Sequence, residues 1–412
     1  MRAPVWAETL RRLVAAGAER AGAGGSRTER IDGIRTEWRE GFVAQAIDAF
    51  VADTPHRHST GADHRGVLDA DDLAAFQASY EEPISGDFRG STVFKAGAWT
   101  QGPILLETLA LLAGFADDDL DLATEGGIHR VAEALKLALA DRESYYGDGL
   151  GAAELETLIG TAYADTRRPL IGDEASTTVR PGGLWSDPYL PELVEVGGVP
   201  ARGPSAGEPT VDRAGQTRGD TCHIDVVDRW GNIVSVTPSG GWLQSSPEIA
   251  AVGFCLGTRL QMTWLDERSP SALRPGKRPR TTLSPTMVKD AAGSVTALGT
   301  PGGDQQDQWQ LLFLLRTILG GQTSQQAIDA PAFHSTSFAE SFWPRTWTPG
   351  GLVVEERVGA EIIEALRARG HRVTVAPGWS LGRLSCVAKD STTGVLSAAA
   401  NPRGAQGYAV GR

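Results

Sequence analysis

The sequence predicts an α+β fold in which helices pack on antiparallel sheets in layers. Two observations favour this fold class. In the first half of the chain, apolar residues recur at helical spacing in several segments, of which 6–21 is the first and 128–146 the last. The second half alternates in short runs separated by turn residues, which is typical of antiparallel hairpins. A chain of 412 residues with 41% hydrophobic residues can bury a large core, so one big domain or two smaller ones are expected.

The composition excludes several classes of protein. A net charge of −12 without a basic stripe disfavours a nucleic-acid partner. No apolar run reaches transmembrane length, and the residues after Met1 do not form a signal peptide. The three cysteines (Cys222, Cys255 and Cys386) are too few for a disulfide framework and lack zinc spacing. We therefore expect no membrane partner and a cytoplasmic location, unless a leader preceded the present start.

The first half should contain mainly helices. Helical spacing covers 6–21, 37–53, 104–113 and 128–146, a short helix starts at Asp71, and 86–94 alternates like a strand. A polar loop holds His56, Arg57, His58 and His64. A metal site there is conceivable, but a solvated loop is favoured because no carboxylate or cysteine has fitting spacing.

A Pro/Gly-rich stretch divides the chain. Fourteen of the 40 residues in 181–220 are Gly or Pro, so regular structure is not expected there. Such a stretch is either a plain linker or an accessible segment that leads to a scissile bond.

The second half should consist of hairpins and strands around two helices. Strands 221–227 and 233–237 are joined by a turn at 228–232, and a second hairpin pairs 286–289 with 294–298. Further strands are expected at 352–355, 372–376, 384–389 and 395–399, with a helix at 358–369. Another helix, 304–319, should have Asp304 as N-cap and Gly320 as C-cap. Gly302 and Gly303 directly precede it, so their N–H groups could bind an oxyanion, although most such glycines only form turns.

Thr221 is a candidate nucleophile that becomes active only after the chain is cut before it. A threonine hydroxyl needs a neighbouring base, and a free α-amine on the same residue can serve as that base. This amine titrates near pH 8, so part of it accepts protons at cellular pH. Within an uncut chain the same nitrogen is an amide, and Asp-Thr at the start of a strand is otherwise common.

Several blocks resemble the γ-glutamyltranspeptidase family. In family order across about 70–410, they are 83–90, 140–143, 220–228, 275–286 and 300–303. The resemblance implies the four-layer αββα sandwich of N-terminal-nucleophile hydrolases. It also implies self-cleavage between Asp220 and Thr221, which would give a large portion, 1–220, and a small portion, 221–412.

The resemblance also implies roles for individual residues. Thr221 would be nucleophile and base, and Ser239 would hydrogen-bond its amine. Gly302 and Gly303 would supply oxyanion N–H groups. The remaining residues implied in substrate binding are Thr281, Thr282, Arg259 and Asp304, the two threonines replacing serines that contact the substrate carboxylate.

The sequence departs from the family near the expected amine-binding site. Gly241 and Arg259 stand where the family holds a glutamyl α-amine, and a guanidinium suits a carboxylate better than an ammonium. The runs 238–247 and 302–309 look more like the amidohydrolase branch, which includes oxamate amidohydrolase. The family also has a long segment before the present start, so the sequence looks truncated at its front.

The leading interpretation is a self-processing amidohydrolase that acts on a small carboxylate-bearing amide. Its alternatives are a true γ-glutamyl hydrolase or transferase and an inactive truncated homologue. No metal and no organic cofactor is expected, because the chain can supply nucleophile, base and oxyanion donors. The expected assembly is a heterodimer cut from one precursor, alone or as a dimer of such heterodimers.

Overall fold

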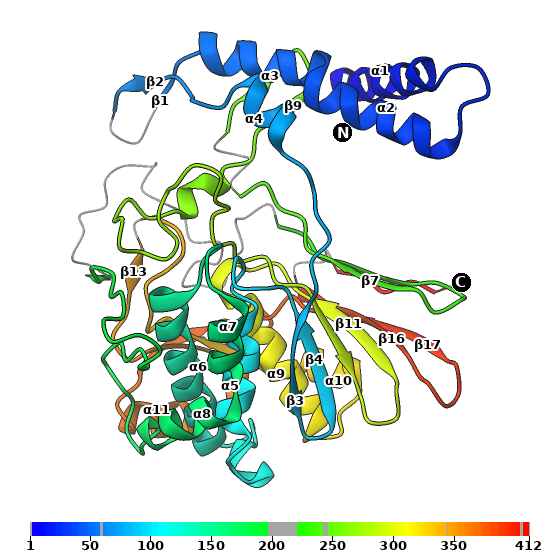
Figure 1. The fold of residues 1–412 in the computed structure, drawn as a ribbon. Helices are drawn as coiled ribbons and strands as arrows, with labels where there is room; N and C mark the ends of the chain where they lie inside the picture. Colours follow the sequence, from blue (N-terminus) through cyan, green and yellow to red (C-terminus); the bar gives the residue numbers. More distant parts are fainter. Residues whose placement is uncertain are drawn as a thin grey trace. The chain divides into compact units, whose positions relative to one another are not determined.

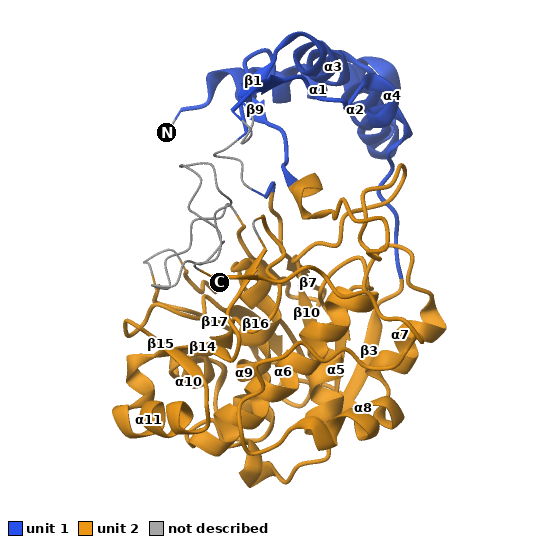
Figure 2. Ribbon diagram, turned by 90° about the vertical axis from the view of Figure 1, so that its left-hand side faces the viewer, with its two compact units in different colours: residues 1–81, 240–258 blue, residues 82–239, 259–412 orange. Residues whose placement is uncertain are grey.

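The computed structural model describes residues 2–57, 61–196, 221–241, 246–343, 345–403 and 407–411. It confirms the α+β class, since helices accompany sheets of which the largest is antiparallel (Figure 1). The chain divides into two compact units, residues 1–81 with 240–258 and residues 82–239 with 259–412 (Figure 2). Both units contain residues from each side of Thr221, so they do not coincide with the predicted subunits.

The smaller unit is mainly helical. In it, α1 (Pro4–Ala21) packs on α2 (Arg27–Glu40) at Gly17, where a Cβ would lie 2.6 Å from the Arg30 carbonyl oxygen. The expected helix at 37–53 is interrupted at Gly41, whose backbone is not helical, and α3 (Phe42–Asp53) follows. The unit also contains α4 (Ala70–Ala75) and the strand pairs β1 (His56–Arg57) with β2 (Asp63–His64) and β8 (Glu248–Ile249) with β9 (Phe254–Cys255). Its buried apolar core comprises Leu13, Val43, Ile47, Val51, Ile249 and Val252.

The larger unit is built on a six-stranded antiparallel sheet in the order β17-β16-β11-β10-β4-β3. The strands are β3 (Ile84–Phe88), β4 (Ser91–Lys95), β10 (Thr286–Lys289), β11 (Val295–Gly299), β16 (Ser385–Lys389) and β17 (Leu396–Ala400). In the centre of this sheet, Val288 of β10 pairs with Val93 of β4. The sheet therefore joins chain from before and after Thr221.

The prediction of one strand at 86–94 is wrong, because the segment is the hairpin β3–β4. Its turn residues Arg89 and Gly90 have φ angles of 49° and 81°. Positive φ at both central residues is what a two-residue hairpin turn of type I′ requires. The alternating pattern continues across this turn, and it therefore resembled a single strand.

Helices cover one face of the six-stranded sheet, and a two-stranded sheet lies on the other. The helices α5 (Pro103–Leu112), α6 (Glu125–Tyr145) and α9 (Gln306–Ile318) share a core with Val93, Val288 and Leu298 of the sheet (Figure 1). On the opposite face, β6 (Ile224–Val227) and β7 (Ile233–Val236) lie against β11 and β16. The larger unit thus has the successive helix, sheet and sheet layers expected of the sandwich.

The remaining elements surround this core. They are α7 (Ala152–Ile159), α8 (Thr161–Arg167), α10 (Ser324–Asp329), α11 (Ala360–Ala368), β5 (Val194–Glu195) paired with β13 (Thr346–Trp347), and the sheet β12 (Phe333–Ser335), β14 (Gly351–Glu355) and β15 (Arg372–Ala376). The strands expected in the last sixty residues are confirmed, whereas α7, α8 and α10 were not predicted.

Asp220, His58 and residues 197–219 lie outside the described residues. Among the described helices, none combines the length and apolar character needed to cross a bilayer.

Candidate active site

Thr221 and Ser239 meet at the open end of the β6–β7 hairpin. The ladder pairs Ile224 with Val236, which places Thr221 opposite Ser239. The Thr221 hydroxyl donates a hydrogen bond to Ser239 Oγ at 2.9 Å. The structure therefore brings together two hydroxyl groups that lie 18 residues apart in the sequence.

The hairpin closes through local contacts. The Asp228 carboxylate accepts hydrogen bonds from the N–H groups of Trp230 and Asn232, both at 2.9 Å. Gly231 between them has a φ of 88°, a conformation that favours glycine. Because all these groups lie within five residues, the sequence was sufficient to predict this turn.

A buried histidine next to Thr221 was not predicted as a site residue. His223 contacts Thr237 Oγ1 and Asp225 Oδ2, each at 2.8 Å, and its side chain is 1% exposed. The signal in the sequence was the alternation of Thr221, His223 and Asp225, which puts the three residues on one side of an extended segment.

The loop before α9 requires glycine. Gly302 and Gly303 have φ angles of 139° and 58°, and a Cβ on Gly302 would lie 2.6 Å from Cζ3 of Trp309. The loop follows β11, continues as the 3-10 helix Gly303–Gln305 and leads into α9. Its N–H groups therefore stand at the start of a helix, where an anion is stabilised.

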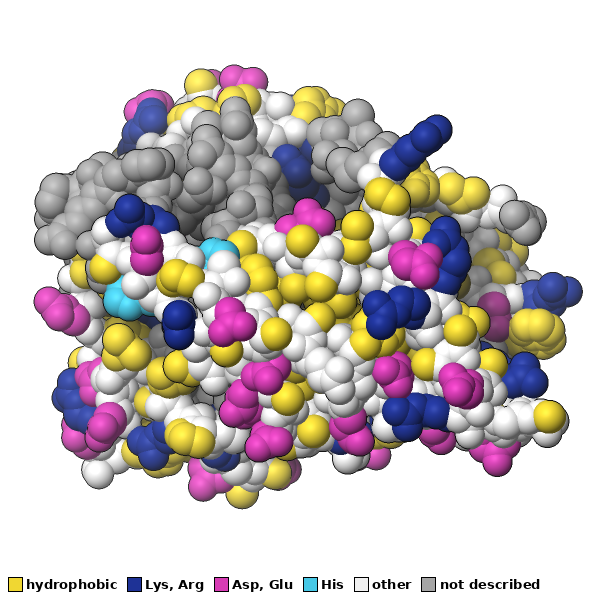
Figure 3. All heavy atoms as spheres, turned by 90° about the horizontal axis from the view of Figure 1, so that it is seen from above, with side chains coloured by type: hydrophobic (Ala, Val, Ile, Leu, Met, Phe, Trp, Pro, Cys, Tyr) yellow, Lys and Arg dark blue, Asp and Glu magenta, His cyan; other side chains and the backbone are white. Residues whose placement is uncertain are grey.

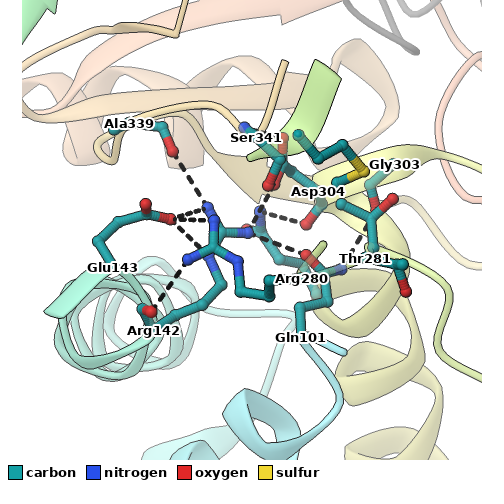
Figure 4. Close-up of polar contacts among 12 residues, drawn as sticks. Gln101, Arg142, Glu143, Arg280, Thr281, Gly303, Asp304, Ala339 and Ser341 are labelled. Atoms are coloured by element: carbon teal, nitrogen blue, oxygen red, sulfur yellow. Dashed lines mark hydrogen bonds and ion pairs between the residues drawn. The ribbon is translucent and has the colours of Figure 1, made fainter. Parts of the chain in front are cut away.

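Asp304 anchors this loop and does not cap α9. Both of its oxygens accept hydrogen bonds within a buried network: Oδ1 from Arg142 Nη1 at 2.5 Å and Oδ2 from the Ser341 N–H at 2.9 Å (Figure 4). The expected N-cap is wrong, because the residue before α9 is Gln305 and no side chain caps the helix there. The expected C-cap is also wrong, since Leu319 and not Gly320 occupies that position.

The same network holds further parts of the site (Figure 4). Gln101 accepts from Arg142 at 2.9 Å and donates to the Gly303 carbonyl at 3.2 Å. Glu143 Oε1 lies 2.7 Å from Arg142 Nη2 and 2.8 Å from Arg280 Nη2. The charges of two guanidinium groups, Arg142 and Arg280, and two carboxylates, Glu143 and Asp304, thus balance, and each of these four side chains is at most 5% exposed.

The predicted substrate-binding residues Thr282 and Arg259 lie together. Arg259, in the 3-10 helix Arg259–Met262, donates from Nη1 to Thr282 Oγ1 at 3.4 Å. A salt bridge from Arg259 to the nearby carboxylate of Asp266 would be the alternative to a substrate-binding role, but Asp266 pairs with Arg268 at 2.8 Å. Thr281 precedes Thr282, is buried, and its hydroxyl oxygen accepts from the Leu283 N–H at 3.4 Å.

One group of described residues has the spacing of metal ligands, namely His129, Glu133 and His371. Glu133 is already paired with Lys136 at 2.6 Å and Arg180 at 3.0 Å. A divalent cation would therefore add charge to a buried cluster that already carries an excess positive charge, which is unfavourable. Burial also lowers the pKa of both histidines, so the pair is best described as two neutral imidazoles joined by a 2.9 Å hydrogen bond.

Acidic and basic side chains are mixed on the face drawn in Figure 3, and no continuous basic stripe crosses the described part of it. The interspersed charges on this face agree with the mixed acidic and basic composition of the sequence.

Comparisons with known proteins give one family and several relatives. The family model described as Gamma-glutamyltranspeptidase matches residues 1–411. The glutathione hydrolase-like YwrD proenzyme of Bacillus subtilis is 30% identical over 347 residues, covering 83% of this chain and 58% of that protein. The oxamate amidohydrolase proenzyme of Klebsiella pneumoniae is 28% identical over 348 residues, covering 82% and 57%.

A solved structure is more similar. The structure of LmbA2991HD is 49% identical with a TM-score of 0.89, and the match covers 100% of this chain and 68% of that one. The chain spans about half the length of the curated relatives it matches, between 46% and 58%.

Proposed function

Because the chain belongs to the gamma-glutamyltranspeptidase family, we propose that it is a self-processing amidohydrolase whose nucleophile is Thr221. The observation that carries this proposal is the 2.9 Å hydrogen bond between the hydroxyl groups of Thr221 and Ser239. A nucleophilic hydroxyl needs a polar partner that orients it, and this contact stands directly beside the predicted cleavage site.

Self-cleavage needs only groups of the chain and one water. The Thr221 hydroxyl oxygen adds to the carbonyl carbon of Asp220, and the peptide C–N bond breaks. The hydroxyl proton ends on the released Thr221 amine, and an ester joins the two residues. Water then hydrolyses this ester, which restores the hydroxyl and leaves Thr221 with a free α-amine.

The mature site would use the same hydroxyl for turnover. The α-amine takes the Thr221 hydroxyl proton while the oxygen attacks the substrate amide carbon. It then gives this proton to the substrate nitrogen, the substrate C–N bond breaks, and the amine or ammonia leaves. Water hydrolyses the acyl-threonine ester and releases the acid. We assign stabilisation of the negatively charged oxygen to the N–H groups of Gly302 and Gly303, and a positioning role to Asp304, whose oxygens are both engaged.

The two products of cleavage should stay together as a heterodimer. Strands β3 and β4 precede Thr221, while β10, β11, β16 and β17 follow it, and β4 pairs with β10 inside one sheet. Separating the pieces would expose this core to water, which is strongly unfavourable. The proposed assembly is one such heterodimer or a dimer of two of them. The three free cysteines support a reducing compartment such as the cytoplasm.

We assign the substrate to amides that carry a carboxylate. Arg259 and the Thr282 hydroxyl lie 3.4 Å apart, and a guanidinium next to a hydroxyl suits a carboxylate. The competing substrate is a γ-glutamyl compound such as glutathione, since the Bacillus subtilis relative is a glutathione hydrolase-like proenzyme.

Intact mass measurement tests the proposal. The wild-type chain should give two masses, for 1–220 and 221–412, and Thr221→Ala should remain a single chain. Thr221→Ser should retain cleavage, because a hydroxyl and an amine both remain. Cys222→Ser is the matched control, since it alters an exposed neighbour and should be cleaved normally. A folded wild-type protein that stays intact from Met1 would contradict the proposal.

A further inference from the structure

The His223 side chain is buried and contacts residues from both arms of the hairpin. Its Nε2 lies 2.8 Å from Asp225 Oδ2, and its Nδ1 lies 2.8 Å from Thr237 Oγ1. The side chains of His223 and Asp225 are 1% and 0% exposed. For a neutral ring, the carboxylate holds the proton on Nε2, so Nδ1 accepts a hydrogen bond from the Thr237 hydroxyl.

The imidazole and its hydrogen-bond partners lie next to different parts of the proposed active site. His223 is two residues after Thr221, and Thr237 is two residues before Ser239. Asp225 also accepts a hydrogen bond from Ser385 Oγ of β16 at 3.4 Å. Through Asp225, the ring therefore connects both arms of the hairpin, at its open end, to the six-stranded sheet.

The ring also lies against the backbone that leads to the glycine loop. A Cβ at Gly299, the last residue of β11, would lie 2.3 Å from Cε1 of His223. This close approach explains why position 299 is glycine. Gly302 and Gly303 follow after Thr300 and Pro301, so the ring also limits where that loop can begin.

We propose that His223 is a positioning residue that holds the Thr221 hydroxyl, Ser239 and the Gly302–Gly303 loop in their working arrangement. The inference rests on the proposed function, because only a reaction at Thr221 requires these three parts to be aligned. An error of about 1 Å in such an arrangement can reduce a rate by about 100-fold.

The test uses the full chain and measures the rate of cleavage before Thr221. His223→Gln should slow cleavage by about 100-fold. Thr237→Val, which removes the hydroxyl partner, should also slow it, whereas Thr237→Ser keeps the hydroxyl and should restore the rate. The matched control is His129→Gln, which changes another buried histidine that bonds to His371 and the Gly172 carbonyl. This control should leave the cleavage rate of the folded fraction unchanged.

A second readout separates this inference from the proposed function. In the Thr221→Ala background, where no cleavage is expected, His223→Gln should increase amide hydrogen exchange in 299–305 relative to the same chain with His223. Unchanged exchange, or cleavage of His223→Gln at the wild-type rate, would overturn the positioning role. If the wild-type chain is not cleaved but exchange still rises, the proposed function fails, and His223 is shown only to hold the 299–305 loop in the fold.

Discussion

Replacing Asp304 by asparagine tests whether the charge network holds the glycine loop. The substitution keeps the shape of the side chain and removes one of the two carboxylates that face Arg142 and Arg280. Both oxygens of Asp304 accept hydrogen bonds, so the NH₂ group of asparagine must face a donor of Arg142 or Ser341. One hydrogen bond is therefore lost together with the charge.

The magnitude follows from burial. Arg142, Glu143, Arg280 and Asp304 are between 0% and 5% exposed, so their charges are screened very little by water. The substitution leaves an excess of one positive charge in this region. Removing one partner of a buried pair typically costs about 3–5 kcal/mol. Since Glu143 remains bonded to Arg142, we expect the lower end, about 3 kcal/mol.

The assay is urea denaturation of the full Thr221→Ala chain followed by tryptophan fluorescence, which keeps self-cleavage out of the comparison. The free energy of unfolding should fall by about 3 kcal/mol in Asp304→Asn. The matched control is Asp266→Asn, which removes an exposed carboxylate paired with Arg268 and should change little. A decrease in the free energy of unfolding below about 1 kcal/mol would refute the reasoning, because a buried uncompensated charge destabilises the fold by more than that.

Two further predictions concern pH and substrate. Burial lowers the pKa of His371 to about 3, from an ordinary value of about 6.5, so the unfolded chain binds a proton that the folded chain does not between these values. The free energy of unfolding should therefore fall as pH drops below about 6.5, by about 1.4 kcal/mol per pH unit for this side chain. In urea titrations His371→Gln should reduce that slope, whereas His64→Gln, which changes an exposed histidine, should not. For the substrate, Arg259→Ala should slow hydrolysis of oxamate by the processed enzyme at least roughly 30-fold, the equivalent of about 2 kcal/mol, because the carboxylate loses a charged partner. Efficient turnover of a γ-glutamyl anilide that is unaffected by Arg259→Ala would contradict the carboxylate assignment.

The outcomes at individual segments show how far the sequence could lead. The β6–β7 hairpin was predicted correctly because Asp228, Gly231 and Asn232 close it within five residues. The hairpin β3–β4 was missed because its alternation continues through Arg89, a residue type that seldom marks a turn with positive φ. Asp304 was expected to cap a helix, as aspartate often does, but Arg142 competes for it from 162 residues away.

The sequence by itself determined the parts of this protein that depend on local chemistry. These are the α+β class, the hairpin that follows Thr221 and the glycine pair before α9, whereas Ser239 entered only through the resemblance to the family. Periodicity, turn residues and reactive groups within about twenty residues of one another carry this information. Only the tertiary structure decided that His223 presses against Gly299, that Arg142 and Arg280 share Glu143, and that Arg259 reaches Thr282. Such contacts join distant segments, and their energies depend on burial and charge balance that exist only once the sheets and helices have packed.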